Sequence, residues 1–341
     1  MIQTDVVIVG AGPCGLFQVF ELGLLGIKSV VVDSLRQPGG QCTELYPDKP
    51  IYDIPAIPVC TGEELTEALL TQIKPFDAGM YLGEEVTVVR RNGDGSLHVE
   101  TRGGRQFTAK AVVIAGGVGS FQPRPLRVPG AEACDGITLH YRVRDPGLFA
   151  GKRLVILGGG DSALDWVIEL ANTAEHITLV HRRDEYRAAP ASVEKMRALA
   201  AAGKVTIIEK AKAKAIEHAD GRLSSITVAP GDGDPVTIAC DHVLAFFGLA
   251  PKLGPIAEWG LDINRKTINV DTEKFETSEP GIYAVGDINH YPGKKKLILC
   301  GFHEAALAAF AIKQQLEPGK KVHVQYTTTS PIMHKRLGVP D

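Results

Sequence analysis

The sequence predicts an α/β protein made of two Rossmann-like dinucleotide-binding domains, each with three layers in ββα order. Three observations carry this prediction. A strand, glycine turn, helix and strand follow one another twice, at residues 5–34 and 153–188. A β-meander pattern with tight-turn residues follows each copy, at residues 85–117 and 213–248. The length of 341 residues suits two domains, each with a core of its own.

The first copy carries the glycine fingerprint of a dinucleotide site. Gly10, Gly12 and Gly15 form G-x-G-x-x-G, with Pro13 and Cys14 inside the turn. The three glycines allow a tight turn, close approach of a pyrophosphate and close helix–strand packing. The pyrophosphate would lie at the helix N-terminus. Asp33 ends the second strand, where an acid accepts a hydrogen bond from a ribose. An ordinary glycine turn would lack this combination.

The second copy predicts an NADP site. Gly158, Gly160 and Ala163 form G-x-G-x-x-A around Asp161 and Ser162. The second strand ends in "HRR", so Arg182 and Arg183 replace the acid, and both can pair with a 2′-phosphate. Arg187 is a third candidate contact. The alternative is a solvated basic loop.

Composition excludes several classes of function. The net charge of −3 disfavours bulk nucleic-acid binding. No apolar run reaches membrane-spanning length, and no export signal is seen, so we expect a cytoplasmic protein without a membrane partner. Cysteines stand at 14, 42, 60, 134, 240 and 300, without metal-ligand spacing, so we expect reduced thiols and no metal.

The late segment "PGIYAVGDI" (280–288), followed by a helical pattern at 297–316, resembles the second FAD motif of two-dinucleotide-binding flavoproteins. The resemblance implies that Asp287 holds the ribityl chain and that the helix beginning near Gly301 faces the flavin. Residues 112–117 resemble the strand at which such chains leave the flavin domain. The implied domains are an FAD domain (1–122 and 247–320), an NADPH domain (123–246) and a tail covering the flavin (321–341). Pro/Gly-rich crossings at 121–130 and 248–255 are hinge candidates.

Neither position at which related flavoenzymes carry a redox dithiol holds two cysteines. Cys42 follows a Gly-Gly pair, but Pro47 stands five residues later. Thioredoxin reductases carry a CxxCD before the second fingerprint, where this sequence has "YRVRD", with Tyr141 and Arg144 in place of the cysteines. We therefore interpret Cys42 as a packed thiol near the flavin.

With this dithiol missing, the chain resembles the thioredoxin-reductase-like ferredoxin/flavodoxin–NADP+ reductases over nearly its whole length. The similarity is strongest at "GGQCTELYPDKPIYDIP", "LGGGDSALDW", "LVHRRDEYRA", "YAVGDI", "YPGKKKLILCGFHEAA" and the tail. It implies a thioredoxin-reductase-like fold with a discontinuous FAD domain. It also implies FAD contacts at Pro13, Cys14, Asp33, Gly40, Gln41, Tyr46, Val86 (through its backbone), Phe121, Asp287 and Thr328.

The resemblance also implies aromatic side chains on both flavin faces. Tyr52 in "PIYDIP" matches a residue stacked on one face, with a core tyrosine as the alternative. The tail would cover the other face, often from a partner subunit, and Tyr326 is the stacking candidate, with His334 as runner-up. A disordered tail is the alternative.

The activity implied by the resemblance is electron transfer between NADPH and ferredoxin or flavodoxin. NADPH would give a hydride to flavin N5, and single-electron steps through a semiquinone would follow. The tail, the hinge or both would gate access to the flavin. A homodimer is expected from the resemblance alone.

Because ferredoxins are usually acidic, we expect a basic docking patch. The candidates are Lys294, Lys295 and Lys296, with Lys335 and Arg336 in the tail. A solvated lysine loop is the alternative.

Two other functions stay open at this stage. One is a thiol/disulfide or peroxide-linked NADPH reductase of the thioredoxin-reductase family, using Cys42 or an external thiol. The other is a flavoprotein without catalytic activity, which would bind FAD but not be reduced by NADPH.

Overall fold

The chain folds into two compact units, one of which is discontinuous in sequence. The computed structural model describes residues 1–143, 145–231 and 233–340, without the side chains of residues 120–123 and 249–251. Unit 1 comprises Met1–Phe121 and Pro251–Asp341, and unit 2 comprises Gln122–Ala250. Two short strands, β11 (Ser120–Pro123) and β20 (Leu249–Lys252), carry the chain between the units and pair with each other.

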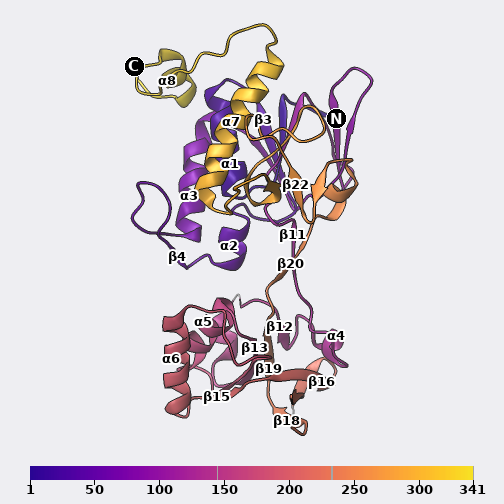
Figure 1. Cartoon of the computed structure of the whole chain (residues 1–341), viewed down its shortest axis with the longest axis vertical. Helices are drawn as coiled ribbons and strands as arrows, with labels where there is room; N and C mark the ends of the chain where they lie inside the picture. The colour runs from indigo at the N-terminus through magenta and orange to yellow at the C-terminus, as the bar shows by residue number, and fades with distance from the viewer. Residues whose placement is uncertain (144, 232, 341) are drawn as a thin grey trace. The chain divides into compact units, whose positions relative to one another are not determined.

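Unit 1 has a parallel five-stranded sheet at its centre (Figure 1). Its strands, in spatial order, are β23 (Ile282–Ala284), β10 (Ala111–Ile114), β2 (Val6–Val9), β3 (Ser29–Asp33) and β6 (Gly79–Leu82). One face of this sheet packs on the helices α1 (Pro13–Leu24), α3 (Gly62–Ile73) and α7 (Ile298–Leu316). The other layer is a second sheet of β1 (Ile2–Gln3), β9 (Gln106–Ala109), β8 (Leu97–Thr101) and β7 (Val86–Arg91).

Successive side chains along the central strands point to opposite faces of the sheet, and this explains the three layers. Val6 and Ile8 of β2 belong to the core shared with α1, α3 and α7, whereas Val7 belongs to the core shared with β7, β8 and β9. Successive strand residues point to opposite faces, so a continuous apolar run predicts a strand covered on both sides.

Shorter elements complete unit 1. They are α2 (Gln41–Leu45), α8 (Pro331–Leu337), the 3₁₀ turns η1 (Lys74–Phe76), η3 (Gly254–Glu258) and η4 (Gly286–Ile288), and the strands β4 (Pro50–Ile51), β5 (Cys60–Thr61), β21 (Ile263–Asn264), β22 (Thr267–Asn269) and β24 (Asn289–His290).

Unit 2 repeats the design of unit 1. Its parallel sheet has the order β12 (Leu139–His140), β19 (His242–Phe246), β13 (Arg153–Gly158), β14 (His176–Val180) and β15 (Val205–Ile208). One face packs on α5 (Asp161–Leu170) and α6 (Pro190–Ala201). The other packs on the antiparallel strands β16 (Ala211–Ala219), β17 (Arg222–Pro230) and β18 (Val236–Ala239) and on α4 (Ala131–Cys134). A 3₁₀ turn, η2, spans Pro146–Phe149.

The fold class predicted from the sequence is confirmed: the protein is α/β, with two Rossmann-like units of three layers and a discontinuous first unit. Among the described residues, no helix is long and apolar enough to cross a membrane.

Candidate functional site

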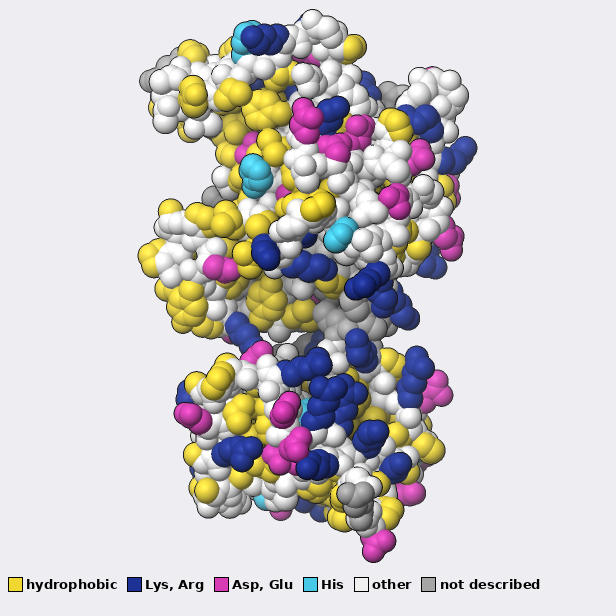
Figure 2. Space-filling view, in the orientation of Figure 1, with side chains coloured by type: hydrophobic (Ala, Val, Ile, Leu, Met, Phe, Trp, Pro, Cys, Tyr) yellow, Lys and Arg dark blue, Asp and Glu magenta, His cyan; other side chains and the backbone are white. Residues whose placement is uncertain are grey.

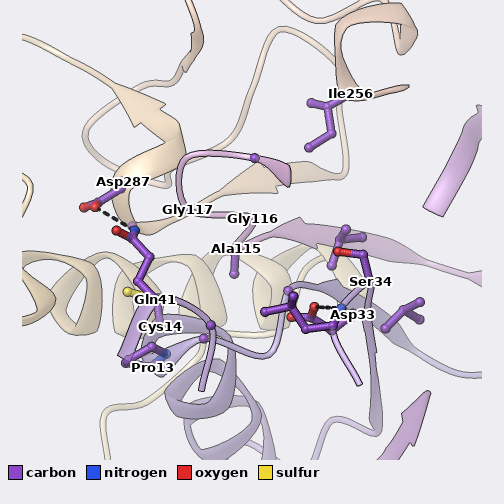
Figure 3. Close-up of a pocket in the computed structure, with 18 of the residues that line it drawn as sticks. Pro13, Cys14, Asp33, Ser34, Gln41, Ala115, Gly116, Gly117, Ile256 and Asp287 are labelled. Carbon is purple, nitrogen blue, oxygen red and sulfur yellow. Dashed lines mark hydrogen bonds between the residues drawn. The ribbon is translucent and has the colours of Figure 1, made fainter. Parts of the chain in front are cut away.

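A pocket of unit 1 lies where the strands of the central sheet end and α1 begins (Figure 3). The glycine turn after β2, the end of β3, the Gly-Asp turn η4 and the start of α7 all contribute to its wall. This is the edge of a parallel sheet at which nucleotides bind, outside the carboxyl ends of the strands.

Two glycines of the first turn have different roles: Gly15 allows α1 to pack closely on the turn, and Gly12 leaves space for a ligand. A Cβ at Gly15 would lie 1.9 Å from the carbonyl oxygen of Gly10, so α1 can approach the turn only without a side chain here. Around Gly12 there is room, because a Cβ would meet nothing closer than the Cα of Gly40 at 4.0 Å. With Gly12 as N-cap of α1, the turn offers backbone to an anionic group, and so it fits a pyrophosphate.

Asp33 ends β3 and lies inside the pocket. Its Oδ2 accepts a hydrogen bond from the N–H of Ala11 at 2.5 Å, and its Oδ1 accepts one from the N–H of Leu35 at 2.7 Å. Burial raises the pKa of Asp33, and these two N–H groups oppose that rise. Carboxylate oxygens have several lone pairs, so capacity remains for a ribose hydroxyl.

Asp287 and Gln41 meet across the pocket from segments far apart in sequence. Gln41 begins α2, and its Nε2 donates to Oδ2 of Asp287 at 3.4 Å (Figure 3). The preceding Gly40 fits against the glycine turn, because a Cβ there would lie 3.1 Å from the Cα of Gly12. These contacts bring the "PGGQ" segment and the Gly-Asp turn together at one site.

Most residues predicted to contact the first nucleotide line this pocket. They are Gly10, Gly12, Pro13, Cys14, Asp33, Gly40, Gln41, Tyr46, Val86 and Asp287. Gly15 instead supports the turn from behind. The side chain of Phe121 lies outside the described residues. Arg144, one of the two residues at the missing dithiol position, also lies outside them.

The sequence interpretation did not identify several lining residues. They include Glu84, Glu85, Leu253, Pro255, Ile256 and Ile298, and Lys296 was named only as a docking residue. Glu84 and Glu85 directly precede Val86, which was predicted to contact FAD, so the sequence analysis had identified this segment of the chain. Leu253, Pro255 and Ile256 come from a crossing segment without a nucleotide motif, and no local signal could have identified them.

The thiols at the pocket are held in their neutral form. Burial raises the pKa of Cys14 to about 12, and the charges of Asp287 and Glu304 add to that rise. Burial also raises the pKa of Cys42, whose Sγ lies 3.6 Å from the hydroxyl of Tyr46. All six cysteines are unpaired. Since the thiolate is the nucleophile, this environment disfavours thiol chemistry at either position.

Neither Tyr52 nor the described part of the tail, residues 321–340, lines this pocket. Tyr52 is 71% exposed and lines a shallow neighbouring hollow with Tyr46, Lys49 and Lys296. Tyr326 is also 71% exposed, and neither Thr328 nor His334 lines the pocket. Helix α8 packs on α1 and η1, with Met333 buried and the Arg336 guanidinium donating to the carbonyl of Leu24. The tail is thus attached at the far end of α1 from the glycine turn.

The docking patch predicted from the lysine run needs one correction. The side chain of Lys294 is only 5% exposed and forms an ion pair with Glu304, whose side chain is 0% exposed. A buried ammonium group cannot meet a docking partner, so Lys294 is not part of a surface patch. Lys295 and Lys296 are exposed.

In unit 2 the second glycine turn has the same relation to its helix. Gly160 is the N-cap of α5, and a Cβ there would have no neighbour within 4 Å, so the turn is open to a ligand. Ala163 is fully buried behind the turn, whereas Asp161 and Ser162 lie at its exposed mouth.

The loop with the three arginines is tied to this turn. The N–H of Arg187 donates to the carbonyl of Gly159 at 2.8 Å, and the N–H of Ala189 donates to Oδ1 of Asp161 at 2.9 Å. Arg182, Arg183 and Arg187 are exposed, and no carboxylate of the described chain pairs with them. Figure 2 shows basic side chains gathered on one face of unit 2. Guanidinium groups beside an open helix N-terminus suit a phosphorylated nucleotide.

His181 was also missed by the sequence interpretation. Its ring stacks on Tyr186 at 4.9 Å between centroids, and its Nε2 lies 3.0 Å from the carbonyl oxygen of Glu185. A Cβ at Gly159 would lie 2.2 Å from the ring. His181 thus supports the glycine turn and the arginine loop together.

Two dinucleotide folds in one chain, with the site of the first closed by a late Gly-Asp turn, define a class of two-nucleotide oxidoreductases. Residues 4–314 match the family model of pyridine nucleotide-disulphide oxidoreductases, and the chain belongs to this family.

Two relatives that are named for an activity are similar to this chain over nearly its whole length. The chain is 61% identical over 342 residues to the ferredoxin–NADP reductase of Methylibium petroleiphilum, covering 99% of this chain and 93% of that protein. It is 60% identical over 337 residues to ferredoxin–NADP reductase 2 of Cupriavidus necator, covering 99% and 91%.

Solved structures share the fold at lower identity. Thioredoxin reductase from T. acidophilum aligns with a TM-score of 0.76 at 24% identity, covering 93% of this chain and 99% of that one. Bacillithiol disulfide reductase from Staphylococcus aureus aligns with a TM-score of 0.77 at 19% identity, covering 93% and 100%.

Proposed function

We propose that this protein is an FAD-dependent ferredoxin–NADP+ reductase that transfers electrons between NADPH and ferredoxin or flavodoxin. Relatives with about 60% identity over nearly the whole chain carry that name, and this is the observation on which the proposal rests. The thiol-linked alternative has less support, because Pro47 and Tyr141 stand where such enzymes need cysteines and because burial raises the pKa of Cys42.

FAD is assigned to the pocket of unit 1. The open backbone at Gly12 would hold the pyrophosphate, Asp33 the ribose of the adenosine half and Asp287 the ribityl chain. When bound, FAD supplies a centre that accepts a hydride and releases electrons one at a time. The protein positions the two nucleotides and excludes competing reactions.

NADPH is assigned to unit 2. The N-terminus of α5 at Gly160 would hold its pyrophosphate, and Arg182, Arg183 and Arg187 its 2′-phosphate. An acid at the end of β14 would favour NAD, and the "HRR" sequence offers none.

The flavin faces are assigned to Tyr52 and Tyr326. Both tyrosines are 71% exposed in one chain, so the ring of each is accessible for stacking on a flavin. Since α8 is attached at the far end of α1, we assign Tyr326 and Thr328 to the flavin of a second copy in a homodimer.

The docking surface for an acidic carrier is assigned to Lys295, Lys296 and Lys335, which are exposed. Lys296 also lines the FAD pocket, so a carrier bound there would be near the flavin. Arg336 contributes less, because its guanidinium already donates to the carbonyl of Leu24. Unpaired thiols throughout the chain agree with a cytoplasmic, reducing location.

The test of this function is NADPH-driven reduction of cytochrome c, with and without a bacterial ferredoxin, and with NADH in parallel. We expect the rate to rise with ferredoxin, to prefer NADPH strongly and to fall with salt, because exposed charges guide the carrier. Enzyme treated with iodoacetamide should keep this rate, because the raised pKa of Cys42 leaves its thiol neutral. A rate indifferent to ferredoxin, or abolished by the alkylation, would refute the proposed function.

A further inference from the structure

A buried charge cluster lies directly beneath the Gly-Asp turn. The carboxylate of Glu304, on α7, is fully buried and accepts four hydrogen bonds. Its Oε2 accepts from the N–H of Gly286 at 2.7 Å and from Nδ2 of Asn289 at 2.8 Å. Its Oε1 accepts from the hydroxyl of Tyr291 at 2.9 Å and from the ammonium of Lys294.

Lys294 completes a clamp on the backbone of one residue, Gly286. Its Nζ also donates to the carbonyl oxygen of Gly286 at 2.9 Å. The N–H and the C=O of Gly286 are therefore each held by one half of the Lys294–Glu304 ion pair. Both groups are charged, so these hydrogen bonds are of the strong, charge-assisted kind.

Gly286 also accepts a hydrogen bond at its carbonyl oxygen from the backbone N–H of Asn289, the C-cap of η4. It has a φ of +78°, which disfavours any residue with a side chain, and a Cβ there would lie 3.0 Å from Sγ of Cys14. The next residue, Asp287, is the one that faces Gln41 in the pocket (Figure 3). Because Gly286 is bonded directly to Asp287, movement of Gly286 displaces that carboxylate.

A buried ion pair contributes little net free energy to the stability of a core. Desolvation of two charges offsets much of their attraction, and apolar residues of similar volume are often as stabilising. A purely structural role would not require charges here. A geometric role explains them, because only hydrogen-bonding groups can fix both backbone polar atoms of Gly286, and charged groups form the stronger hydrogen bonds.

We propose that Lys294 and Glu304, supported by Tyr291 and Asn289, are positioning residues that hold Asp287 in place to bind the flavin cofactor. This inference rests on the proposed function, in which FAD occupies the pocket. The pair does not touch the reacting atoms. It sets the affinity for FAD through the backbone of Gly286.

A double-mutant cycle on FAD affinity tests this proposal. The full-length chain is stripped of flavin and titrated with FAD as wild type, Lys294→Met, Asp287→Ala and the double variant. We expect Lys294→Met to weaken FAD binding about 10-fold in the wild-type background and less than about 2-fold when Asp287→Ala is present. Lys266→Met, at an exposed lysine of unit 1 that does not line the pocket, is the matched control and should leave the affinity unchanged.

A milder change covers the case in which Lys294→Met does not fold. Tyr291→Phe removes one neutral donor from Glu304 and keeps the ion pair. It should weaken FAD binding about 3-fold, again only while Asp287 is intact. Equal factors in the two backgrounds would show that the cluster acts on stability alone and would overturn the inference. A wild-type chain that takes up no FAD would overturn the proposed function itself.

Discussion

Arg182 and Arg183 stand at the residue position that distinguishes the two nucleotides. We expect Arg182→Ala combined with Arg183→Ala to raise KM for NADPH by about 10- to 100-fold and to leave KM for NADH nearly unchanged. The reason is that NADH lacks the 2′-phosphate to which the arginines are assigned. Steady-state kinetics with both nucleotides measure this effect.

Lys212→Ala is the matched control for that experiment, because Lys212 is an exposed basic residue of the same unit on β16. Equal losses with NADPH and NADH would assign the arginines to the folding of the loop rather than to phosphate recognition.

Lys294 shows where residue-level prediction from sequence ends. The run Lys294–Lys296 reads as one polar loop, yet its first member is buried against Glu304 and its neighbours are exposed. The partner is ten residues away on α7, and no sequence pattern of charge marks the pair. In contrast, Gly12 and Asp33 were predicted from the fixed spacing of the dinucleotide fingerprint, and Asp287 from the family resemblance, and all three line the pocket.

At the scale of elements, an ion pair joins the first residue of β13, Arg153, to Asp241, the residue directly before β19. Arg153 donates from its Nη2 to Oδ1 of Asp241 at 2.8 Å, and its backbone N–H donates to Oδ2 at 2.8 Å. These hydrogen bonds lower the pKa of Asp241 to about 2, from an ordinary value of 3.8. The pair therefore stabilises the sheet of unit 2 only while Asp241 is ionised.

We expect Asp241→Asn to lower the free energy of unfolding of unit 2 by about 1 kcal/mol at pH 7, a value reduced for solvent screening. Since the folded pKa lies below the unfolded one, the stabilisation is complete above about pH 4. It is lost as the pH falls towards 2. The difference between variant and wild type should therefore shrink below pH 4.

Urea unfolding followed by the fluorescence of Trp166 measures this difference, in a chain carrying Trp259→Phe so that only unit 2 reports. Asp234→Asn, at an exposed aspartate of the same unit, is the control. A difference that stays constant from pH 7 to pH 3 would rule out the ionised pair as its cause.

Element-level prediction succeeded where a pattern is local. Apolar runs in the sequence predicted the strands β2, β3, β13 and β14, and the glycine turns predicted where α1 and α5 begin. Sequence could not place α8, whose contacts with α1 and η1 join residues more than 250 positions apart. Its expected role over the flavin stays a prediction.

At the scale of the whole molecule, the exposed tail tyrosine tests the homodimer. Tyr326 is 71% exposed, so Tyr326→Ala should leave the thermal stability of the isolated chain nearly unchanged. If Tyr326 stacks on the flavin of a second copy, the variant should show brighter flavin fluorescence, because aromatic contact quenches it. Fluorescence spectra of the loaded enzyme, taken at concentrations at which sedimentation shows a dimer, measure this.

Val324→Ala is the control, because Val324 is 65% exposed on the same stretch of tail and carries no ring. Identical spectra for Tyr326→Ala, Val324→Ala and the wild type would remove Tyr326 from the flavin and leave His334 as the candidate.

The discontinuity of unit 1 has a consequence during synthesis on the ribosome. Val112 of β10 pairs with Ile282 of β23, and 170 positions separate them in the chain. At translation rates of about 5–20 residues per second, β23 is synthesised roughly 10–30 s after β10, and β10 lacks this pairing strand until then. Unit 2 is continuous and can fold during that interval. The nascent chain thus carries a finished nucleotide unit beside a sheet with an open edge, and that edge is where chaperones would be needed most.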